Sequence, residues 1–225
     1  MTEYFIPTQA AEATFVEKRS EFIGHVWPVE SEEEARGHIE AMKKKYHDAR
    51  HNCWCYVVKD GPVRYSDDGE PQGTAGQPML GVFQKEGVTN VCCVVTRYFG
   101  GILLGAGGLV RAYTQAAQEG LAASVIGVER AGYEILVTID YNGVGKLQYL
   151  MGQRGIEPIY SEHGVDVRFT LLIPVEKSEE IHKAMVEASN GRVKWEKEKN
   201  FILLTKIANR NKIESDNRQF ERWWL

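Results

Sequence analysis

Hydrophobic and polar positions divide the first half of the chain into strands and helices. Two extended runs, ATFVEK and SEFIGHVWPV, meet at the polar pair Arg19-Ser20 and predict a β-hairpin over 13–28. A Ser-x-x-Glu capping box at Ser31, followed by apolar residues at helical spacing, predicts an amphipathic helix over 31–46. The same criteria predict the rest of this half: a strand at 51–58, a long loop at 59–74, a helix at 75–85, a strand at 89–98, a Gly-rich loop and a helix at 109–124.

After Gly127 the pattern restarts as a compact set of alternating elements. It predicts a strand at 133–140, a helix at 143–152, strands at 157–162 and 165–173 that form a hairpin around His163-Gly164, a helix at 178–189 and a strand at 192–207. The order β-α-β-β-α-β is that of ferredoxin-like domains. We therefore predict an α+β protein of two domains, 1–129 and 130–207. A polar tail follows at 208–225, and we expect its aromatic end to dock on this chain or on a neighbour.

Composition and charge narrow the possible partners without identifying one. The 225 residues are 43% hydrophobic and 26% charged, which is ordinary for soluble globular proteins. The net charge of −4 excludes a uniformly basic protein that wraps nucleic acid, so any RNA contact has to rest on a local basic patch. The chain has neither a signal-peptide pattern at its start nor a run of about 20 apolar residues. We therefore expect a cytoplasmic protein with no membrane partner.

The four cysteines are spaced as a C-x-C pair, Cys53 and Cys55, and a C-C pair, Cys92 and Cys93. Neither spacing matches the C-x₂₋₄-C pairs of structural zinc sites. Both pairs lie in apolar runs, where a small, reduced, buried side chain is the ordinary outcome. We predict inert thiols and no metal, which fits a reducing compartment.

Glycine is concentrated between residues 61 and 108, which hold 11 of the 22 glycines. Amides at a helix N-terminus attract anions, and Arg97 and Arg111 flank a Gly-rich loop with donors suited to phosphate or carboxylate. The segment TRYFGGILLGAGGLVRAY therefore predicts an anion site, although it matches neither the P-loop nor the dinucleotide-binding spacing. The alternative is that the glycines serve tight packing and the arginines pair with acids. The glycines concerned are Gly100, Gly101, Gly105, Gly107 and Gly108.

Three carboxylates, Asp67, Asp68 and Glu70, lie within four residues of one another in the polar segment YSDDGEPQGTAGQP. Such a group is compatible with a Mg²⁺ site, with an acid–base pair, or with a solvated turn. A fourth interpretation is that these carboxylates pair with Arg97 and Arg111 and thereby order this loop against the Gly-rich loop. We favour the ion pairs.

His47 and His51 are four residues apart, a spacing that would bring them together on a helix. The predicted change from helix to strand near Arg50 spoils that geometry, so we expect His51 to line the cleft between the two loops instead of holding a metal. The chain has no G-x-S-x-G motif and no cysteine predicted to be an exposed thiolate. Covalent catalysis therefore has no obvious nucleophile.

The two unusual segments, YSDDGEPQGTAGQP and VVTRYFGGILLGAGGLVRAY, resemble the signature segments of the IMPACT family. The resemblance extends upstream through Lys18 to Ile23 and His51, and it covers about the first 125 residues strongly. The second domain is similar to the C-terminal module of the family in pattern and position. With its two-domain length, the chain resembles the bacterial YigZ-type members of this family.

This resemblance implies a fold for each domain. For the first domain it implies the two-layer α/β fold shared by a domain of a ribosomal small-subunit protein and by the GHMP small-molecule kinases. For the second domain it implies similarity to a C-terminal domain of elongation factor G. Eukaryotic relatives are associated with the control of translation initiation, which makes regulation of translation the expected context. Such an analogy at the level of the fold says nothing by itself about the chemistry of the site.

We therefore expect a non-enzymatic cytoplasmic protein that binds RNA, the ribosome or a ribosome-associated protein, without a cofactor. Tyr98 or Phe99 would stack on a base if exposed. Two alternatives stay open: an enzyme acting on a small phosphorylated or carboxylated substrate, and a purely protein-binding adaptor. The residues expected to form the binding site are Arg97, Tyr98, Gly100, Gly101, Gly105, Gly107, Gly108, Arg111, Asp67, Asp68, Glu70 and His51.

Overall fold

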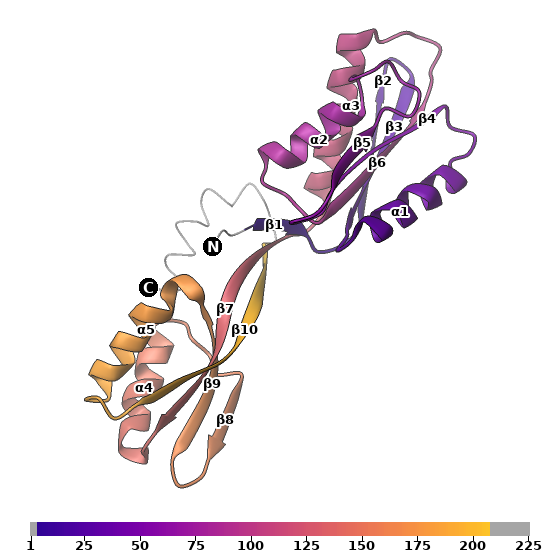
Figure 1. Ribbon diagram of the computed structural model, residues 1–225. Coiled ribbons are helices and arrows are strands. Elements are labelled where there is room, and N and C mark those ends of the chain that lie inside the picture. Colours follow the sequence, from indigo (N-terminus) through magenta and orange to yellow (C-terminus); the bar gives the residue numbers. More distant parts are fainter. Residues whose placement is uncertain (1–3, 208–225) are drawn as a thin grey trace. The chain divides into compact units, whose positions relative to one another are not determined.

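The computed structural model describes residues 4–207, so the tail predicted at 208–225 lies outside the described residues. The described chain forms two compact units, Tyr4–Gly127 and Val128–Thr205, shown in Figure 1. Both units combine strands with helices, which confirms the predicted mixed α and β fold class. None of the described helices is long and apolar enough to cross a membrane.

The first unit is built on a five-stranded sheet of order β2-β3-β6-β4-β5, in which every pair of neighbours is antiparallel. In chain order its elements are β1 (Tyr4–Pro7), β2 (Ala11–Glu17), β3 (Ser20–Pro28), α1 (Glu32–Lys45), β4 (His51–Val57), β5 (Val63–Ser66), α2 (Gly76–Lys85), β6 (Val91–Tyr98) and α3 (Ala106–Ala123). Strand β6 lies at the centre of the sheet, and the candidate arginine Arg97 lies near its end.

Helices cover both faces of this sheet. Helices α2 and α3 pack on one face, where Phe83 and Tyr113 belong to the larger apolar core, while α1 packs on the other face through Ile39. Side chains alternate across a strand, so the neighbours Cys92 and Cys93 of β6 enter opposite cores. The unit thus has a helical layer on each side of the sheet.

The four cysteines are buried and unpaired, as predicted. Burial raises the pKa of the Cys53 and Cys92 thiols above the ordinary value, because a thiolate loses its hydration in an apolar core. These two thiols therefore stay protonated and have little nucleophilic character.

Two of the predicted elements form for the local reasons that the sequence displays. Strands β2 and β3 make the predicted hairpin, with the turn at Lys18 and Arg19, which both have positive φ, as the two central residues of a tight hairpin turn require. The side chain of Ser31 accepts a hydrogen bond from the amide of Glu34 at the start of α1. Three acidic residues in the first turn and three lysines in the last turn of α1 also match the helix dipole.

Three features of the first unit differ from the prediction. The segment 59–74, predicted to be a loop, contains the edge strand β5, whose exposed side chains gave no alternating pattern. Strand β1 was not predicted. Helix α3 begins at Ala106 and not near residue 109, so Gly107 and Gly108 form its first turn. Glycine is unfavourable inside helices, which is why the sequence pattern places the start of this helix too late.

The second unit has the predicted order β-α-β-β-α-β and the sheet order β10-β7-β9-β8. Its core includes Ile135, Leu147 and Phe169. The side chain of Asp140 caps α4 by accepting a hydrogen bond from the amide of Gly143 at 3.0 Å. The elements are β7 (Ile126–Ile139), α4 (Tyr141–Gln153), β8 (Tyr160–His163), β9 (Val167–Pro174), α5 (Val175–Ala188) and β10 (Lys194–Ile207).

Candidate functional site

Asp67 shapes the acidic loop and does not pair with an arginine. One carboxylate oxygen accepts from the amides of Ala75 at 3.0 Å and Gly76 at 2.9 Å, and the other accepts from the amide of Gly73 at 2.8 Å. Cys53 donates to the Asp67 carbonyl at 2.9 Å. The carboxylate therefore organises the backbone that leads into α2, and the expected ion pair with Arg97 or Arg111 is wrong for this residue.

Asp68 connects the same loop to the start of β4. Its carboxylate accepts a hydrogen bond from the amide of Asn52 at 2.7 Å, and Lys43 Nζ lies 3.8 Å from the other oxygen. The backbone of Asp68 has a φ of +43°, which turns its carbonyl toward β4, where His51 Nδ1 donates to that carbonyl at 2.8 Å. Asp68 therefore orients His51 and, like Asp67, makes no ion pair with the predicted arginines.

Glu70 is the one carboxylate of the loop that forms the predicted ion pair. It accepts a hydrogen bond from Arg97 Nη1 at 2.5 Å and another from the hydroxyl of Tyr113 at 2.9 Å. The side chains of Glu70 and Arg97 are 4% and 6% exposed, so the pair is shielded from water. Burial, followed by the charges near its hydroxyl, raises the pKa of Tyr113, which therefore stays a hydrogen-bond donor.

Strand register explains why residues far apart in sequence meet here. Arg97 of β6 lies opposite His51 of β4 on one side and opposite Phe22 of β3 on the other. Directly opposed residues of antiparallel strands share a face of the sheet, so all three side chains point to the same side. The Arg97 guanidinium lies 5.5 Å from the ring centres of Phe22 and Phe99 and makes cation–π contacts with both.

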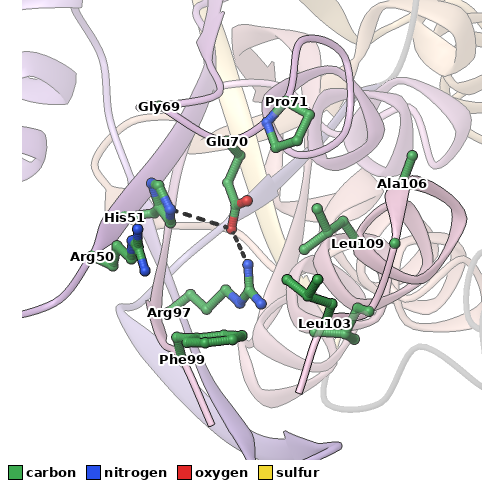
Figure 2. A pocket seen from close by; sticks show the side chains of 12 residues that line it. Arg50, His51, Gly69, Glu70, Pro71, Arg97, Phe99, Leu103, Ala106 and Leu109 are labelled. Carbon is green, nitrogen blue, oxygen red and sulfur yellow. Dashed lines mark hydrogen bonds and ion pairs between the residues drawn. The ribbon is translucent and has the colours of Figure 1, made fainter. Parts of the chain in front are cut away.

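These residues border a pocket of about 400 Å³ in the first unit, shown in Figure 2. Glu70 points between His51 and Arg97 at one wall, and leucines from the Gly-rich loop and α3 form the opposite wall. Arg50 is exposed at the rim and was missed by the sequence analysis, although it directly precedes the strand that carries His51. The lining residues are Arg50, His51, Gly69, Glu70, Pro71, Arg97, Phe99, Leu103, Leu104, Gly105, Ala106 and Leu109.

The glycines of the second loop have different roles. A Cβ on Gly100 would lie 2.0 Å from the backbone of Arg19, so Gly100 is required for close packing, and its amide also donates to Ser20 Oγ at 3.2 Å. Gly105 lines the pocket and is the N-cap of α3, with a φ of +72°. Gly101 lies at an exposed position, and Gly107 and Gly108 belong to α3. Close packing therefore explains Gly100, while Gly105 borders the pocket.

The N-terminus of α3 opens onto the pocket through Gly105 and Ala106. Its first turn contains no acidic residue, and no side chain caps it. Arg111 is exposed one turn further on, and its Nη1 atom lies 3.7 Å from the position that a Cβ on Gly107 would take. Among the described residues, Arg111 has no acidic partner. Positive charge therefore gathers at this helix end.

Two other candidates lie apart from the pocket. Tyr98 follows Arg97 on the strand and so points to the opposite face, where its hydroxyl donates to Asp48 at 2.9 Å. His47 is exposed after α1, while His51 lies on β4, so the two histidines do not share a helix face. Within the described part of the chain, no three His, Cys, Asp or Glu side chains are grouped to hold a metal ion.

Comparison with known proteins assigns both units. A family model described as the Impact N-terminal domain matches residues 18–121, and one described as a domain of unknown function, DUF1949, matches residues 137–192. The chain is 41% identical to the IMPACT family member YvyE of Bacillus subtilis over 196 residues, which are 84% of this chain and 88% of that protein. The chain belongs to the IMPACT family.

Other IMPACT family members resemble this chain over different lengths. YigZ of Escherichia coli is 34% identical over 197 residues, which are 85% of this chain and 96% of that protein. Protein IMPACT of Rattus norvegicus is 31% identical over 105 residues, which are 44% of this chain and only 33% of the rat protein. A crystal structure described as that of a hypothetical protein is 31% identical, with a TM-score of 0.56, over 87% of this chain and 97% of that one.

Proposed function

We propose that this IMPACT family member is a cytoplasmic, non-enzymatic protein that binds RNA of the translation machinery through the pocket of its first unit. The observation that carries the proposal is the N-terminus of α3, which opens onto this pocket and has no acidic side chain in its first turn. The exposed Arg50 lines the same pocket, and the exposed Arg111 follows in the next turn of the helix. The amides of a first helical turn have no partner within the helix, and the helix dipole adds positive potential. A phosphate group fits both properties.

The arginines divide into two kinds. Arg97 forms an ion pair with Glu70, which offsets the charge of the guanidinium, so Arg97 supports the wall of the pocket. The buried Nε of Arg97 has no hydrogen-bond partner among the described residues. Arg50 and Arg111 are exposed and have no acidic partner in the described chain. We therefore assign phosphate contact to Arg50 and Arg111 in place of the Arg97 and Arg111 pair that the sequence suggested.

The rim favours RNA over an acidic protein surface. Phe99 is 39% exposed at the edge of the pocket, and an exposed aromatic ring beside cationic groups is a platform on which an unpaired base stacks. A volume of about 400 Å³ is sufficient for one nucleotide but small for a protein segment. The role in translation is proposed because the chain belongs to a family whose eukaryotic members are associated with translation initiation.

The test is binding of a fluorescent single-stranded RNA of mixed sequence at several salt concentrations. We expect the variant Arg50→Ala/Arg111→Ala to bind more weakly and to lower the slope of log affinity against log salt by about 1.4, or about 0.7 for each lost contact with a single strand. The control Arg36→Ala/Arg64→Ala removes the same charge from exposed positions of the same unit and should leave the slope unchanged. An unaltered slope in the first variant would contradict the assignment.

Sedimentation of the protein with ribosomes separates RNA from protein partners. If RNA is the ligand, the Arg50→Ala/Arg111→Ala variant should leave the ribosomal fractions and the oligonucleotide should compete with ribosomes for the wild type. A protein that sediments with ribosomes but binds no oligonucleotide would instead recognise an acidic protein surface, and RNA binding would be refuted.

A further inference from the structure

His51 carries its ring hydrogen on a defined nitrogen. Its Nδ1 lies 2.8 Å from the carbonyl oxygen of Asp68, and a carbonyl only accepts hydrogen bonds, so Nδ1 is the donor. In a neutral imidazole the other nitrogen is then an acceptor. His51 lines the pocket with 14% of its side chain exposed, which makes its Nε2 a hydrogen-bond acceptor on the pocket wall.

The ring of His51 is held in this orientation from several sides. Strand register fixes its backbone opposite Arg97. The carbonyl that orients it belongs to Asp68, whose amide donates to Ser66 Oγ at 3.2 Å and whose carboxylate accepts from Asn52. A Cβ on Gly69 would lie only 3.4 Å from Nδ1, so the backbone of this glycine packs against the ring. A ligand therefore meets a preformed acceptor.

No protein group takes up this acceptor among the described residues. Glu70 Oε1 lies 3.9 Å from Nε2, which is beyond hydrogen-bond distance, and this oxygen itself only accepts when ionised. That oxygen already accepts hydrogen bonds from Arg97 and Tyr113. Arg50 directly precedes His51 in the chain, is exposed and has no acidic partner among the described residues, so it attracts an anion. A ligand that carries a hydroxyl donor close to an anionic group would therefore complement this wall of the pocket.

We propose that His51 accepts a hydrogen bond from a ribose 2′-hydroxyl, so that the pocket selects RNA over DNA. This inference rests on the proposed function, in which a phosphate lies at the N-terminus of α3. In RNA the 2′-hydroxyl lies next to the phosphate, whereas DNA has no donor at that position. DNA would therefore bind through the same phosphate contacts and leave His51 Nε2 without a partner.

The experiment compares RNA and DNA oligonucleotides of one sequence at about pH 8, where imidazole side chains are generally neutral. One ordinary hydrogen bond corresponds to a preference for RNA of about 3- to 10-fold. His51→Leu should remove this preference by weakening RNA binding while leaving DNA binding unchanged. His51→Gln, whose amide oxygen can still accept, should keep part of the preference.

Two controls make the outcomes distinct. Arg50→Ala should weaken RNA and DNA equally, because a phosphate contact carries no information about the sugar. An RNA with 2′-O-methyl groups lacks the hydroxyl donor, so its affinity for the wild-type protein should be about that of DNA. This control needs no substitution and therefore does not depend on whether a His51 variant folds.

The failure of this inference differs from the failure of the proposed function. Binding of neither oligonucleotide would refute the proposed function. Equal binding of RNA, DNA and 2′-O-methyl RNA, or a preference for RNA that persists in folded His51→Leu, would leave RNA binding intact and overturn the role of His51.

Discussion

The substitution Glu70→Gln tests how the buried ion pair supports the first unit. Glutamine keeps the shape of the side chain and can still accept a hydrogen bond from Tyr113, but it removes the negative charge opposite Arg97. The Arg97 side chain is 6% exposed, and among the described residues its only other side-chain hydrogen bond is to Ser20 Oγ at 3.5 Å. The substitution therefore leaves a buried guanidinium without an ionic partner.

The expected loss in the free energy of unfolding is large. Removing one member of a buried ion pair costs about 3–5 kcal/mol, because the remaining charge stays out of water. The hydrogen bond that glutamine can retain places Glu70→Gln near the lower end, at about 3 kcal/mol. This is a substantial fraction of the roughly 5–15 kcal/mol that stabilises an ordinary domain. Replacing both partners in Glu70→Leu/Arg97→Met removes the unpaired charge but leaves the buried Tyr113 hydroxyl without its acceptor, so this variant should stay about 1–3 kcal/mol less stable than wild type.

Native-state hydrogen exchange on the full chain measures this loss unit by unit. The slowest amides of β6 report the global opening of the first unit, and those of β9 in the second unit serve as an internal reference. Glu40→Gln removes a carboxylate from an exposed position of α1 and should change neither set. Protection of β6 in Glu70→Gln that stays within about 1 kcal/mol of wild type would refute the structural role of the ion pair.

Two further predictions concern packing and pH. Gly24→Ala should lower the free energy of unfolding by about 1–3 kcal/mol, because its Cβ would lie 2.5 Å from the carbonyl oxygen of Ala116. In contrast, a Cβ on Gly37 in α1 meets no atom within 4 Å, so Gly37→Ala should raise the free energy of unfolding by about 0.5–1 kcal/mol. Urea titration of both variants measures these changes. Burial lowers the pKa of His25 despite the charge of Glu12. Acidification below about pH 6.5 therefore protonates His25 in the unfolded state first, and the free energy of unfolding falls. Between about pH 7 and pH 5, His25→Leu should lose less of its free energy of unfolding than wild type.

Local signals in the sequence were sufficient for most of the fold. The capping box of α1 and the restart of the pattern after Gly127 identify elements that form for reasons contained within a few residues. The elements that were missed lack such signals. The short edge strand β5 exposes most of its side chains, and the first turn of α3 consists largely of glycine, which disfavours helices.

The predicted site residues include four that line the pocket, His51, Glu70, Arg97 and Gly105, but the sequence did not indicate which side chains pair. The two unusual segments do face one pocket, and His51 does line it. However, the pairing of Glu70, and not of Asp67 or Asp68, with Arg97 depends on strand register and on the path of the acidic loop. Arg50 was missed because the sequence gives an isolated arginine no distinguishing pattern; only the strand that begins after it brings it to the rim.

The acidic loop and the Gly-rich loop separate stability from binding. Most of the polar groups in the acidic loop are committed within the fold: Asp67 to its own backbone, Asp68 to β4, and Glu70 to Arg97. Because these groups are already paired, they give the pocket its shape without adding much net charge. In the proposed function, the end of α3 and the exposed arginines attract the anion, and His51 Nε2 selects among anionic ligands. Substitutions in the first set should therefore change unfolding more than binding, and substitutions in the second set should do the reverse.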